Sequence, residues 1–244
     1  MSDGGVNKTA QLRIGKSLVI AIDGPSGSGK SSVAREVARR LGLAYQDTGA
    51  MYRALTLVCL ENRVAVQNQA AVEALAKRFY YEQWFDPGVD MVAAGVDAED
   101  ALDVTDEIRE PRVSEAVSAV ATNLGARTEL IRRQRAAIDS VRHRMVVEGR
   151  DITTVVAPQA EVRLLLTASE EARLARRGAQ LAANGEKQST EQLAEQVLAR
   201  DAKDSTVVDF QRAADGVVTL DSSDLDFEQT VQAVLRLVQE SVGG

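Results

Sequence analysis

The residues best suited to chemistry stand in the stretch GPSGSGKSS, which runs from Gly24 to Ser32. It matches the pattern G-x-x-x-x-G-K-[ST], follows an apolar run and precedes a helical one. Its glycines let the backbone curl so that successive N–H groups face one anion, and a helix start adds positive potential. A chance glycine-serine turn is the alternative, and both flanks disfavour it. The predicted nucleoside triphosphate site comprises Gly24, Pro25, Ser26, Gly27, Ser28, Gly29, Lys30, Ser31 and Ser32.

Two side chains of this loop have tasks of their own. The Lys30 ammonium reaches the β- and γ-phosphates of a nucleotide, and the Ser31 hydroxyl is placed to bind Mg²⁺. We therefore expect Lys30 to be catalytic and Ser31 to be the metal ligand.

A second cluster of polar residues follows in DTGAMYR, from Asp47 to Arg53. Thr48 and Tyr52 are four residues apart, so they lie on one face of the predicted helix, and Arg53 lies beside them. A guanidinium can bind an anion with two hydrogen bonds, and a tyrosine can stack or hydrogen-bond. The stretch predicts a second anion site; alone, Arg53 is equally well explained as a surface residue.

The stretch EGRD places a cation and a carboxylate at the end of a predicted core strand, as Arg150 and Asp151. In open α/β sheets, ligands gather at the carboxyl ends of the strands. The pair therefore predicts a further part of the second site. An ion pair in a loop is the other interpretation of adjacent opposite charges.

Bulk composition excludes several classes of protein. The net charge is −7, which disfavours a general nucleic-acid binder. The single cysteine, Cys59, and the single histidine, His143, exclude an intrachain disulfide and a zinc site built on such ligands. A GTPase switch needs an Asp-x-x-Gly element and an Asn-Lys-x-Asp element, and the chain has neither. These exclusions leave a phosphotransferase that acts on a small molecule.

The elements that must position these residues alternate between strand and helix. Apolar runs predict five core strands, in SLVIAID, LAYQ, RMVVEG, EVRLLLTA and DGVVTL. Between them, periodic stretches predict helices at Lys30–Leu41, after Asp47 or Thr48 as the cap, at Glu115–Thr122 and at Arg127–Val141. A last helix opens at Asp226 with Gln229 in capping-box spacing, and its expected buried stripe is Phe227, Val231, Val234 and Val238. The pattern predicts an α/β fold with a doubly wound parallel sheet.

Two segments interrupt this alternation. Most of the aromatic residues stand in the first, where FYYEQWF, VDMVA and GVDA predict a small antiparallel sheet. In the second, charged helices at Ser169–Ala183 and Thr190–Lys203 suit a mobile lid. The predicted division is a tail at 1–16, a core at 17–63, 115–168 and 205–244, an insertion at 64–114 and a lid at 169–204.

Neither a secretory signal nor a membrane span is expected. The tail from Met1 to Lys16 is polar and has no apolar central region, and no run of about 18 apolar residues occurs in the chain. Together with the lone cysteine, this predicts a cytoplasmic protein.

At this point the chain resembles bacterial cytidylate kinases. The resemblance rests on GPSGSGKSS, DTGAMYR, RRQR, EGRD and RDAKDS, in this order and spacing, and extends over nearly the whole chain from about Leu18. It implies a phosphate-binding-loop kinase with an inserted subdomain for the nucleoside monophosphate and a helical lid. It also implies transfer of the γ-phosphoryl group of ATP to CMP or dCMP with Mg²⁺, in the cytoplasm, by a monomer that binds neither nucleic acid nor membrane.

The resemblance also implies roles for individual residues. Arg53, Arg150 and Arg200 match the family arginines that hold the acceptor phosphate. Of these, Arg150 and Arg200 are expected to be catalytic together with Lys30. A carboxylate at Asp151 suits cytosine, whose 4-amino group donates a hydrogen bond where uracil has a carbonyl. The full expected CMP site is Thr48, Tyr52, Arg53, Ser118, Arg127, Arg150, Asp151, Arg200 and Asp204, the last of these for the sugar hydroxyls.

One position departs from the family pattern. Val207 stands three residues after Asp204, where the family commonly has an arginine, and Arg212 is the possible substitute. Other arginines have two interpretations each. Those of RRQR are expected to form a solvated or structural helix face; Arg173, Arg176 and Arg177 fit either phosphoryl contacts or an exposed face.

Two rival functions remain open from the sequence. One is a kinase of the same architecture that acts on UMP or a small metabolite. The other is a regulator that binds ATP as a switch and turns nothing over, which the missing switch motifs and the second anion site disfavour.

Overall fold

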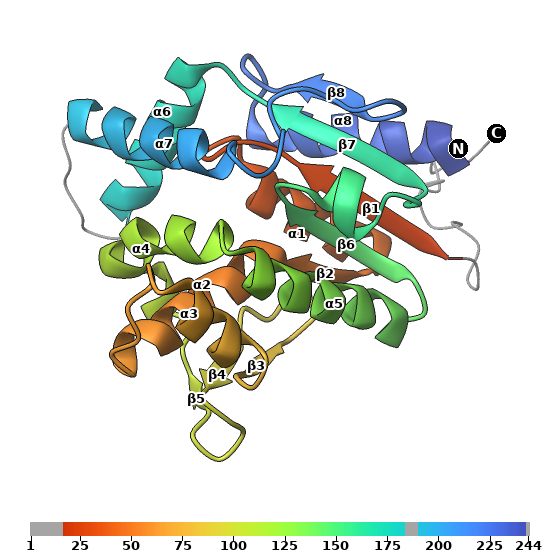
Figure 1. The fold of residues 1–244 in the computed structure, drawn as a ribbon. Helices are drawn as coiled ribbons and strands as arrows, with labels where there is room; N and C mark the ends of the chain where they lie inside the picture. The colour runs from red at the N-terminus through yellow and green to blue at the C-terminus, as the bar shows by residue number, and fades with distance from the viewer. Residues whose placement is uncertain (1–16, 184–189, 243–244) are drawn as a thin grey trace, which may run out of the picture.

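A parallel sheet of five strands forms the centre of the computed structural model, which describes residues 17–183 and 190–242. The strand order is β2-β6-β1-β7-β8, and every neighbouring pair is parallel (Figure 1). The strands are β1 (Leu18–Asp23), β2 (Ala44–Asp47), β6 (Arg144–Gly149), β7 (Val162–Thr167) and β8 (Val218–Asp221). All six residues of β1 are buried, as expected for a strand covered on both faces. The predicted α/β fold with five parallel strands is confirmed.

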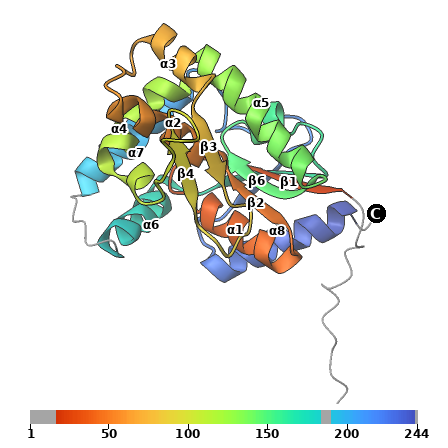
Figure 2. The same ribbon diagram turned by 90° about the horizontal axis from the view of Figure 1, so that it is seen from below.

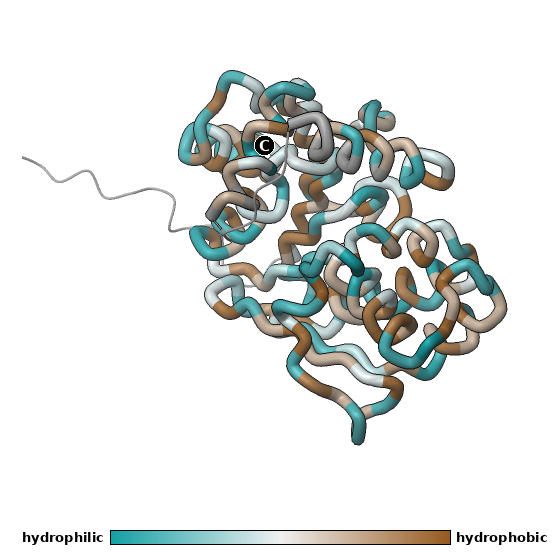
Figure 3. The backbone as a smooth tube through the Cα atoms, turned by 90° about the vertical axis from the view of Figure 1, so that its left-hand side faces the viewer, coloured by the Kyte–Doolittle hydropathy of each residue, from teal (hydrophilic) through white to brown (hydrophobic). Residues whose placement is uncertain are grey.

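Helices cover both faces of this sheet (Figure 2). On one face, α1 (Lys30–Leu41) and α8 (Phe227–Val242) pack through Val37 and Val234 on Ile20 and Ile22 of β1. On the other face, α5 (Leu124–Ser140) and the short π-helical turn η3 (Ile152–Val156) pack on side chains such as Val19 and Met145. Hydrophobic residues follow one another along the central strands, whereas hydrophilic residues are frequent in the outer helices and loops (Figure 3).

Capping decides where α8 begins. The Asp226 carboxylate accepts a hydrogen bond from the Gln229 amide N–H at 2.7 Å, and the Gln229 side chain accepts one from the Asp226 N–H at 2.9 Å. The predicted capping box is therefore present. Val231, Val234 and Val238 are buried as predicted. The prediction for Phe227 is wrong: its side chain is 51% exposed, because the first residue of the helix precedes the turns that cross the sheet.

A second body of the molecule combines three helices with a small sheet. The helices are α2 (Thr48–Glu61), α3 (Gln69–Ala76) and α4 (Pro111–Ala121), and the antiparallel sheet consists of β3 (Tyr80–Gln83), β4 (Val92–Gly95) and β5 (Leu102–Asp103). A turn, η2 (Glu107–Arg109), leads into α4. These elements and the start of α5 share a hydrophobic core of their own. The predicted small antiparallel sheet is confirmed.

Two predicted boundaries in this body are wrong. The stretch GVDA is no strand, because β4 ends at Gly95, where a Cβ would approach the Asp100 carbonyl oxygen to 2.7 Å, and Asp97 accepts hydrogen bonds within the following turn. The helix expected from Glu115 begins at Pro111 instead. A proline suits the first turn of a helix, since its missing N–H would have no partner there.

The remaining helices, α6 (Glu170–Ala183) and α7 (Thr190–Asp204), lie side by side near the end of the sheet at which β1 passes into α1 (Figure 1). Within residues 17–183 and 190–242, no helix is both long enough and apolar enough to cross a membrane. The predicted tail at 1–16 lies outside the described residues, and the division into core, insertion and lid stays a prediction.

Candidate active site

The loop between β1 and α1 has the shape of an anion cradle. Gly27 and Gly29 adopt positive φ angles of 76° and 86°, which glycine reaches without steric cost. A side chain at Gly24 would clash with the Leu166 carbonyl oxygen. The glycines at these positions therefore let the backbone turn tightly and let other groups approach it closely.

Lys30 and Ser31, at the start of α1, meet a buried carboxylate on β6. The Lys30 ammonium lies 3.8 Å from the Glu148 carboxylate, and the Ser31 hydroxyl donates to the same carboxylate at 2.7 Å. Burial and the neighbouring Asp47 carboxylate raise the pKa of Glu148 to about 7. Glu148 thus joins the two loop side chains that were predicted to act on phosphate and metal.

Asp47 links this group to the second predicted cluster. Asp47, on β2, lies directly opposite Glu148 of β6 in the sheet register, and the two carboxyl groups interact. Its carboxylate caps α2 by accepting from the Ala50 N–H at 3.0 Å, and it pairs with the Arg53 guanidinium at 2.6 Å. Burial acts to raise the pKa of Asp47, but Arg53 outweighs it and lowers the value to about 2. A continuous line of contacts therefore leads from Lys30 to Arg53.

The first turn of α2 also positions Thr48 and Tyr52. The Thr48 hydroxyl donates to the Glu148 carbonyl oxygen at 2.8 Å, which ties the helix start to β6. The Tyr52 hydroxyl and the Nε of Arg53 are buried and have no hydrogen-bond partner within the described part of the chain. Buried polar groups without a partner are rare, so this pair suits a polar ligand.

Arg150 joins the loop to α7. Its guanidinium donates to the Gly24 carbonyl oxygen and, at 2.7 Å, to the Ser26 hydroxyl. It also pairs with Asp201 at 3.2 Å and Asp204 at 3.3 Å, two carboxylates of α7. The same guanidinium lies 4.6 Å from the centre of the Phe210 ring, within the range of a cation–π contact. Arg150 therefore lies directly against the phosphate loop.

The residues expected to read the acceptor base lie together. Asp151 is buried and pairs with the Arg127 guanidinium, and the Ser118 hydroxyl donates to Asp204 at 3.2 Å. Burial raises the pKa of Asp151, and the Arg127 charge opposes this rise. Ser118 and Arg127, which were assigned by resemblance alone, thus join Asp151 and Asp204 in one place.

A buried carboxylate at the end of β1 holds the turn that follows Asp151. Asp23 accepts hydrogen bonds from the Ile152 N–H at 2.7 Å, the Thr153 N–H at 2.9 Å and the Thr153 hydroxyl at 2.5 Å. Because Asp23 directly precedes the loop, one side chain connects the loop with the backbone that follows Asp151.

Two arginines of α6 contact the loop through its carbonyl oxygens. Arg173 donates to the Ser26 carbonyl at 3.0 Å and pairs with Asp201. Arg176 donates to the Ser28 carbonyl at 3.0 Å and to the Ser222 backbone at 2.6 Å. Neither lies on an exposed face, so of the two interpretations only a position at the loop fits them.

The other predicted residues fall into three groups. Arg200 lies in α7, but its side chain is outside the described part of the chain. Arg212 is exposed, and its backbone N–H donates a hydrogen bond to Asp209. In the RRQR stretch, Arg132 pairs with Glu129, and Arg133 and Arg135 donate to backbone carbonyls, which confirms the structural interpretation of that helix face.

Several residues of the site escaped the sequence interpretation. Glu148 and Asp47 stand in the quoted stretches EGRD and DTGAMYR, close to residues that were singled out, and that position was the signal available for them. Asp23, Asp201 and Phe210 contact partners far along the chain. Asp201 stands in the quoted stretch RDAKDS, but nothing local indicated its contact with the loop.

The residues near Ser31 fit a magnesium ion. The Ser31 hydroxyl and the carboxylates of Glu148 and Asp47 are hard oxygen donors, which Mg²⁺ prefers, and Mg²⁺ commonly completes its shell with phosphate and water. Within the described residues, no group of three or more His, Cys, Asp or Glu side chains forms an all-protein metal site. The arrangement suits a metal that arrives with a nucleotide.

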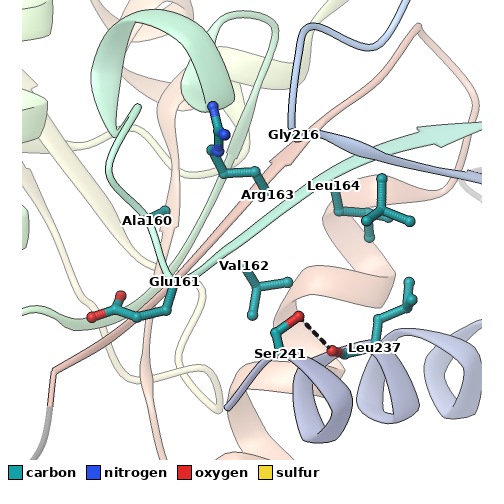
Figure 4. A pocket seen from close by; sticks show the side chains of 9 residues that line it. Ala160, Glu161, Val162, Arg163, Leu164, Gly216, Leu237 and Ser241 are labelled. Atoms are coloured by element: carbon teal, nitrogen blue, oxygen red, sulfur yellow. Dashed lines mark hydrogen bonds between the residues drawn. The ribbon is translucent and has the colours of Figure 1, made fainter. Parts of the chain in front are cut away.

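A separate cavity of about 190 Å³ lies away from this site. It is lined by Glu161, Val162, Arg163 and Val218, among others, at the amino ends of β7 and β8 (Figure 4). The phosphate loop lies at the carboxyl ends of the strands, where ligands of such sheets bind. This cavity therefore takes no part in the candidate site.

A family profile and the relatives found by sequence name one family. The family profile described as Cytidylate kinase matches residues 20–240. A Cytidylate kinase of Cutibacterium acnes is 46% identical over 91% of this chain and 96% of its own length. One from Rhodococcus jostii is 42% identical over 93% and 96%, and one from Streptomyces avermitilis is 40% identical over 91% and 93%. A solved structure from Thermus thermophilus aligns with a TM-score of 0.43 at 20% identity, over 90% of this chain and 97% of that one.

Proposed function

The chain belongs to the cytidylate kinase family, and from that premise we propose how its residues transfer a phosphoryl group from ATP to CMP or dCMP. It is an ATP-dependent nucleoside monophosphate kinase. The observation that carries the proposal is the line of contacts from Lys30 through Glu148 and Asp47 to Arg53, which brings the loop lysine and the arginine of the expected acceptor site to one pair of interacting carboxyl groups.

ATP binds with its phosphates in the loop Gly24–Ser32. Backbone N–H groups and the start of α1 hold the oxygens, and Lys30 neutralises charge at the β- and γ-phosphates. Ser31 would hold Mg²⁺, with Glu148 and Asp47 orienting its water ligands; the ion supplies charge neutralisation between the phosphates.

CMP binds between α2, α4 and the segment Arg150–Asp151. Arg53 and Arg150 hold its phosphate, together with Arg200, and Thr48 and Tyr52 line the pocket. Asp151 accepts a hydrogen bond from the cytosine 4-amino group, and Arg127 and Ser118 complete the polar wall. Asp204 accepts from the sugar hydroxyls.

Transfer proceeds in line, from the γ-phosphorus to an oxygen of the acceptor phosphate. The transition state is loose and anionic, so positioning and cationic groups supply the rate, and no covalent intermediate forms. The acceptor is already an anion, so a strong general base is not required. Arg173 and Arg176 of α6 contact the loop, and their positive charges help to neutralise the negative charge of the transferred group. The helices α6 and α7 act as a lid that excludes water. The enzyme acts as a cytoplasmic monomer.

A panel of acceptors tests this function. Release of ADP is measured by a coupled assay with CMP, dCMP, UMP, AMP and shikimate, each with ATP and Mg²⁺. We expect CMP and dCMP to give the highest kcat/KM, and UMP to be lower by about tenfold or more, since one buried hydrogen bond distinguishes them. Equal rates with UMP would remove the role of Asp151. ATP binding without release of ADP by any acceptor would favour the regulator.

A loop variant provides the matching control. Lys30→Ala should lower kcat by about 100-fold or more while circular dichroism and the unfolding midpoint stay near those of the parent, because Lys30 acts on developing charge. Turnover at the parent rate would contradict the assignment of the loop.

A further inference from the structure

A second cavity, of about 530 Å³, lies outside the site described above. Its walls come from β2, from Met51 of α2, from β3 with the two residues after it, and from the middle and end of α5 (Figure 2 shows these elements). The volume is within the range of cavities that hold small organic ligands. None of the residues that line it belongs to the proposed ATP or CMP site.

One lining residue is a buried amide without a partner. Gln46 is 1% exposed, and neither its side-chain oxygen nor its side-chain nitrogen has a hydrogen-bond partner within the described part of the chain. The residues on either side of it in β2 do have partners: the Tyr45 hydroxyl contacts Glu148, and Asp47 pairs with Arg53. An unsatisfied buried polar group costs on the order of 1–3 kcal/mol. Gln46 therefore has a donor and an acceptor to offer to a ligand in this cavity.

The other walls are aromatic. Tyr81, Trp84 and Phe85 line the cavity, and with Phe79 and Tyr80 they bring five of the nine aromatic residues of the chain into seven positions. The Tyr81 hydroxyl is already bonded to Gln83 at 3.0 Å, so these residues offer mainly ring faces and edges. Neither the loop nor the acceptor site uses this aromatic group.

The combination indicates the chemistry of the ligand. Aromatic rings stack on nucleobases of any kind, whereas a glutamine amide bonds best to the adjacent amino group and ring nitrogen of adenine. The guanidinium groups at this cavity are engaged, Arg132 by Glu129 and Arg133 by Glu129 and the Phe79 carbonyl oxygen. A phosphate would find no uncommitted cation there, so a neutral group fits better than a charged one.

We propose that this cavity binds the base of an adenine nucleoside, which stacks on the aromatic wall and bonds to the amide of Gln46. This site is separate from the phosphate loop, and its ligand need not carry a phosphate group.

The chain supplies its own probe for a test. Trp84 is its single tryptophan and lines the cavity, so its fluorescence reports on binding there. The enzyme is first saturated with GDP, CMP and Mg²⁺, so that both nucleotide sites are filled without turnover and without any adenine, and adenosine is then titrated. We expect a saturable change in emission. Absence of such a change up to millimolar adenosine overturns the proposal.

Two comparisons identify the amide as the recognising group. Purine riboside, which lacks the 6-amino group, should bind about tenfold more weakly than adenosine, since it loses one of two hydrogen bonds. Gln46→Met should abolish the emission change and leave kcat and both KM values unchanged. Gln67→Met, at an exposed position, is the matched control and should respond like the parent.

The outcomes separate clearly. A full response in Gln46→Met overturns the proposal. Should that variant fail to fold, the two nucleosides on the parent enzyme decide, and equal affinity for adenosine and purine riboside overturns it as well.

Discussion

At the scale of single residues, buried carboxylates do most of the positioning in this site. Each holds a cation or a backbone segment in place, and these contacts are present in the structure without a bound substrate. The pairs are Glu148 with Lys30, Asp47 with Arg53, Asp151 with Arg127, and Asp204 with Arg150. A catalyst that works through positioning gains from such ordering, because less freedom is lost on binding.

Asp151→Ala tests base recognition. The variant removes the acceptor for the cytosine amino group and leaves Arg127 unpaired in a buried place. We expect the KM for CMP to rise by about 10- to 100-fold, from the loss of one charge-assisted hydrogen bond, while the KM for ATP stays within about threefold. Initial rates with each substrate varied measure both values. Equal increases in the two KM values would assign Asp151 to general stability instead.

Thr153 tests the support behind that residue. Thr153→Val removes the hydroxyl that bonds to buried Asp23, so the free energy of unfolding should fall by about 1–3 kcal/mol. If this bond also positions Asp151, the preference for CMP over UMP should weaken with little change in kcat. Thr153→Ser keeps the hydroxyl and should restore both properties. Lost stability with an unchanged CMP/UMP preference would leave Thr153 a purely structural role.

At the scale of elements, one arginine fastens α1 to α8. Arg40 pairs with Glu36 on its own helix at 2.7 Å and with Glu228 on α8 at 2.6 Å. Arg40 lowers the pKa of Glu228 to about 2, and Arg39 with Arg40 lowers the pKa of Glu36 to about 2. Because α1 begins directly after the loop, the link between α1 and α8 also helps to fix the position of the loop.

The pH dependence of this link has a definite sign. Carboxylates with a lowered pKa stabilise the folded state above their unfolded pKa, near 4.5, and lose that contribution as the pH falls toward 2. Arg40→Gln should therefore be slightly less stable than the parent at pH 7, and the difference should shrink between pH 4.5 and pH 3. Urea unfolding at several pH values measures it. A difference that grows in acid would contradict the assigned pairs.

The sequence predicts elements of this kind well and long-range contacts poorly. Five strands and the helices that flank the loop follow from local periodicity, and the capping box of α8 follows from two residues. The exposed Phe227 depended on where α8 crosses the sheet, which no local pattern gives. Within the site, DTGAMYR and EGRD marked the right segments. The contacts of Asp23 with Thr153 and of Asp201 with the loop join residues more than a hundred positions apart, so only the fold reveals them.

At the scale of the whole molecule, α7 reaches into the phosphate loop. The Asp201 carboxylate accepts a hydrogen bond from the Ser26 N–H at 3.1 Å and pairs with Arg150 and Arg173. In the proposed function, the substrate phosphates take up the same amide and the same guanidinium groups. We therefore expect a carboxylate of the chain to compete with the nucleotide in this conformation.

Asp201→Asn tests that competition. The change weakens the hold on the loop amide and on both arginines, and each effect favours an added anion. Calorimetry should show ADP binding about three- to tenfold more tightly than to the parent, the range of one ordinary hydrogen bond, because asparagine weakens these contacts without removing them all. Asp201→Glu, which keeps the charge, is the control. Weaker ADP binding to the asparagine variant would show that Asp201 supports the loop and does not compete.

The course of α5 has a mechanical consequence. Ala126 and Leu130, near its start, are packed in the core of the second body, whereas Ile138, near its end, is packed on the central sheet. One helix thus belongs to both hydrophobic cores, and it carries Arg127 near its amino end. A rotation of one core against the other would therefore take place about this helix. It would change both the position of Arg127 and the distance between the two proposed phosphate sites.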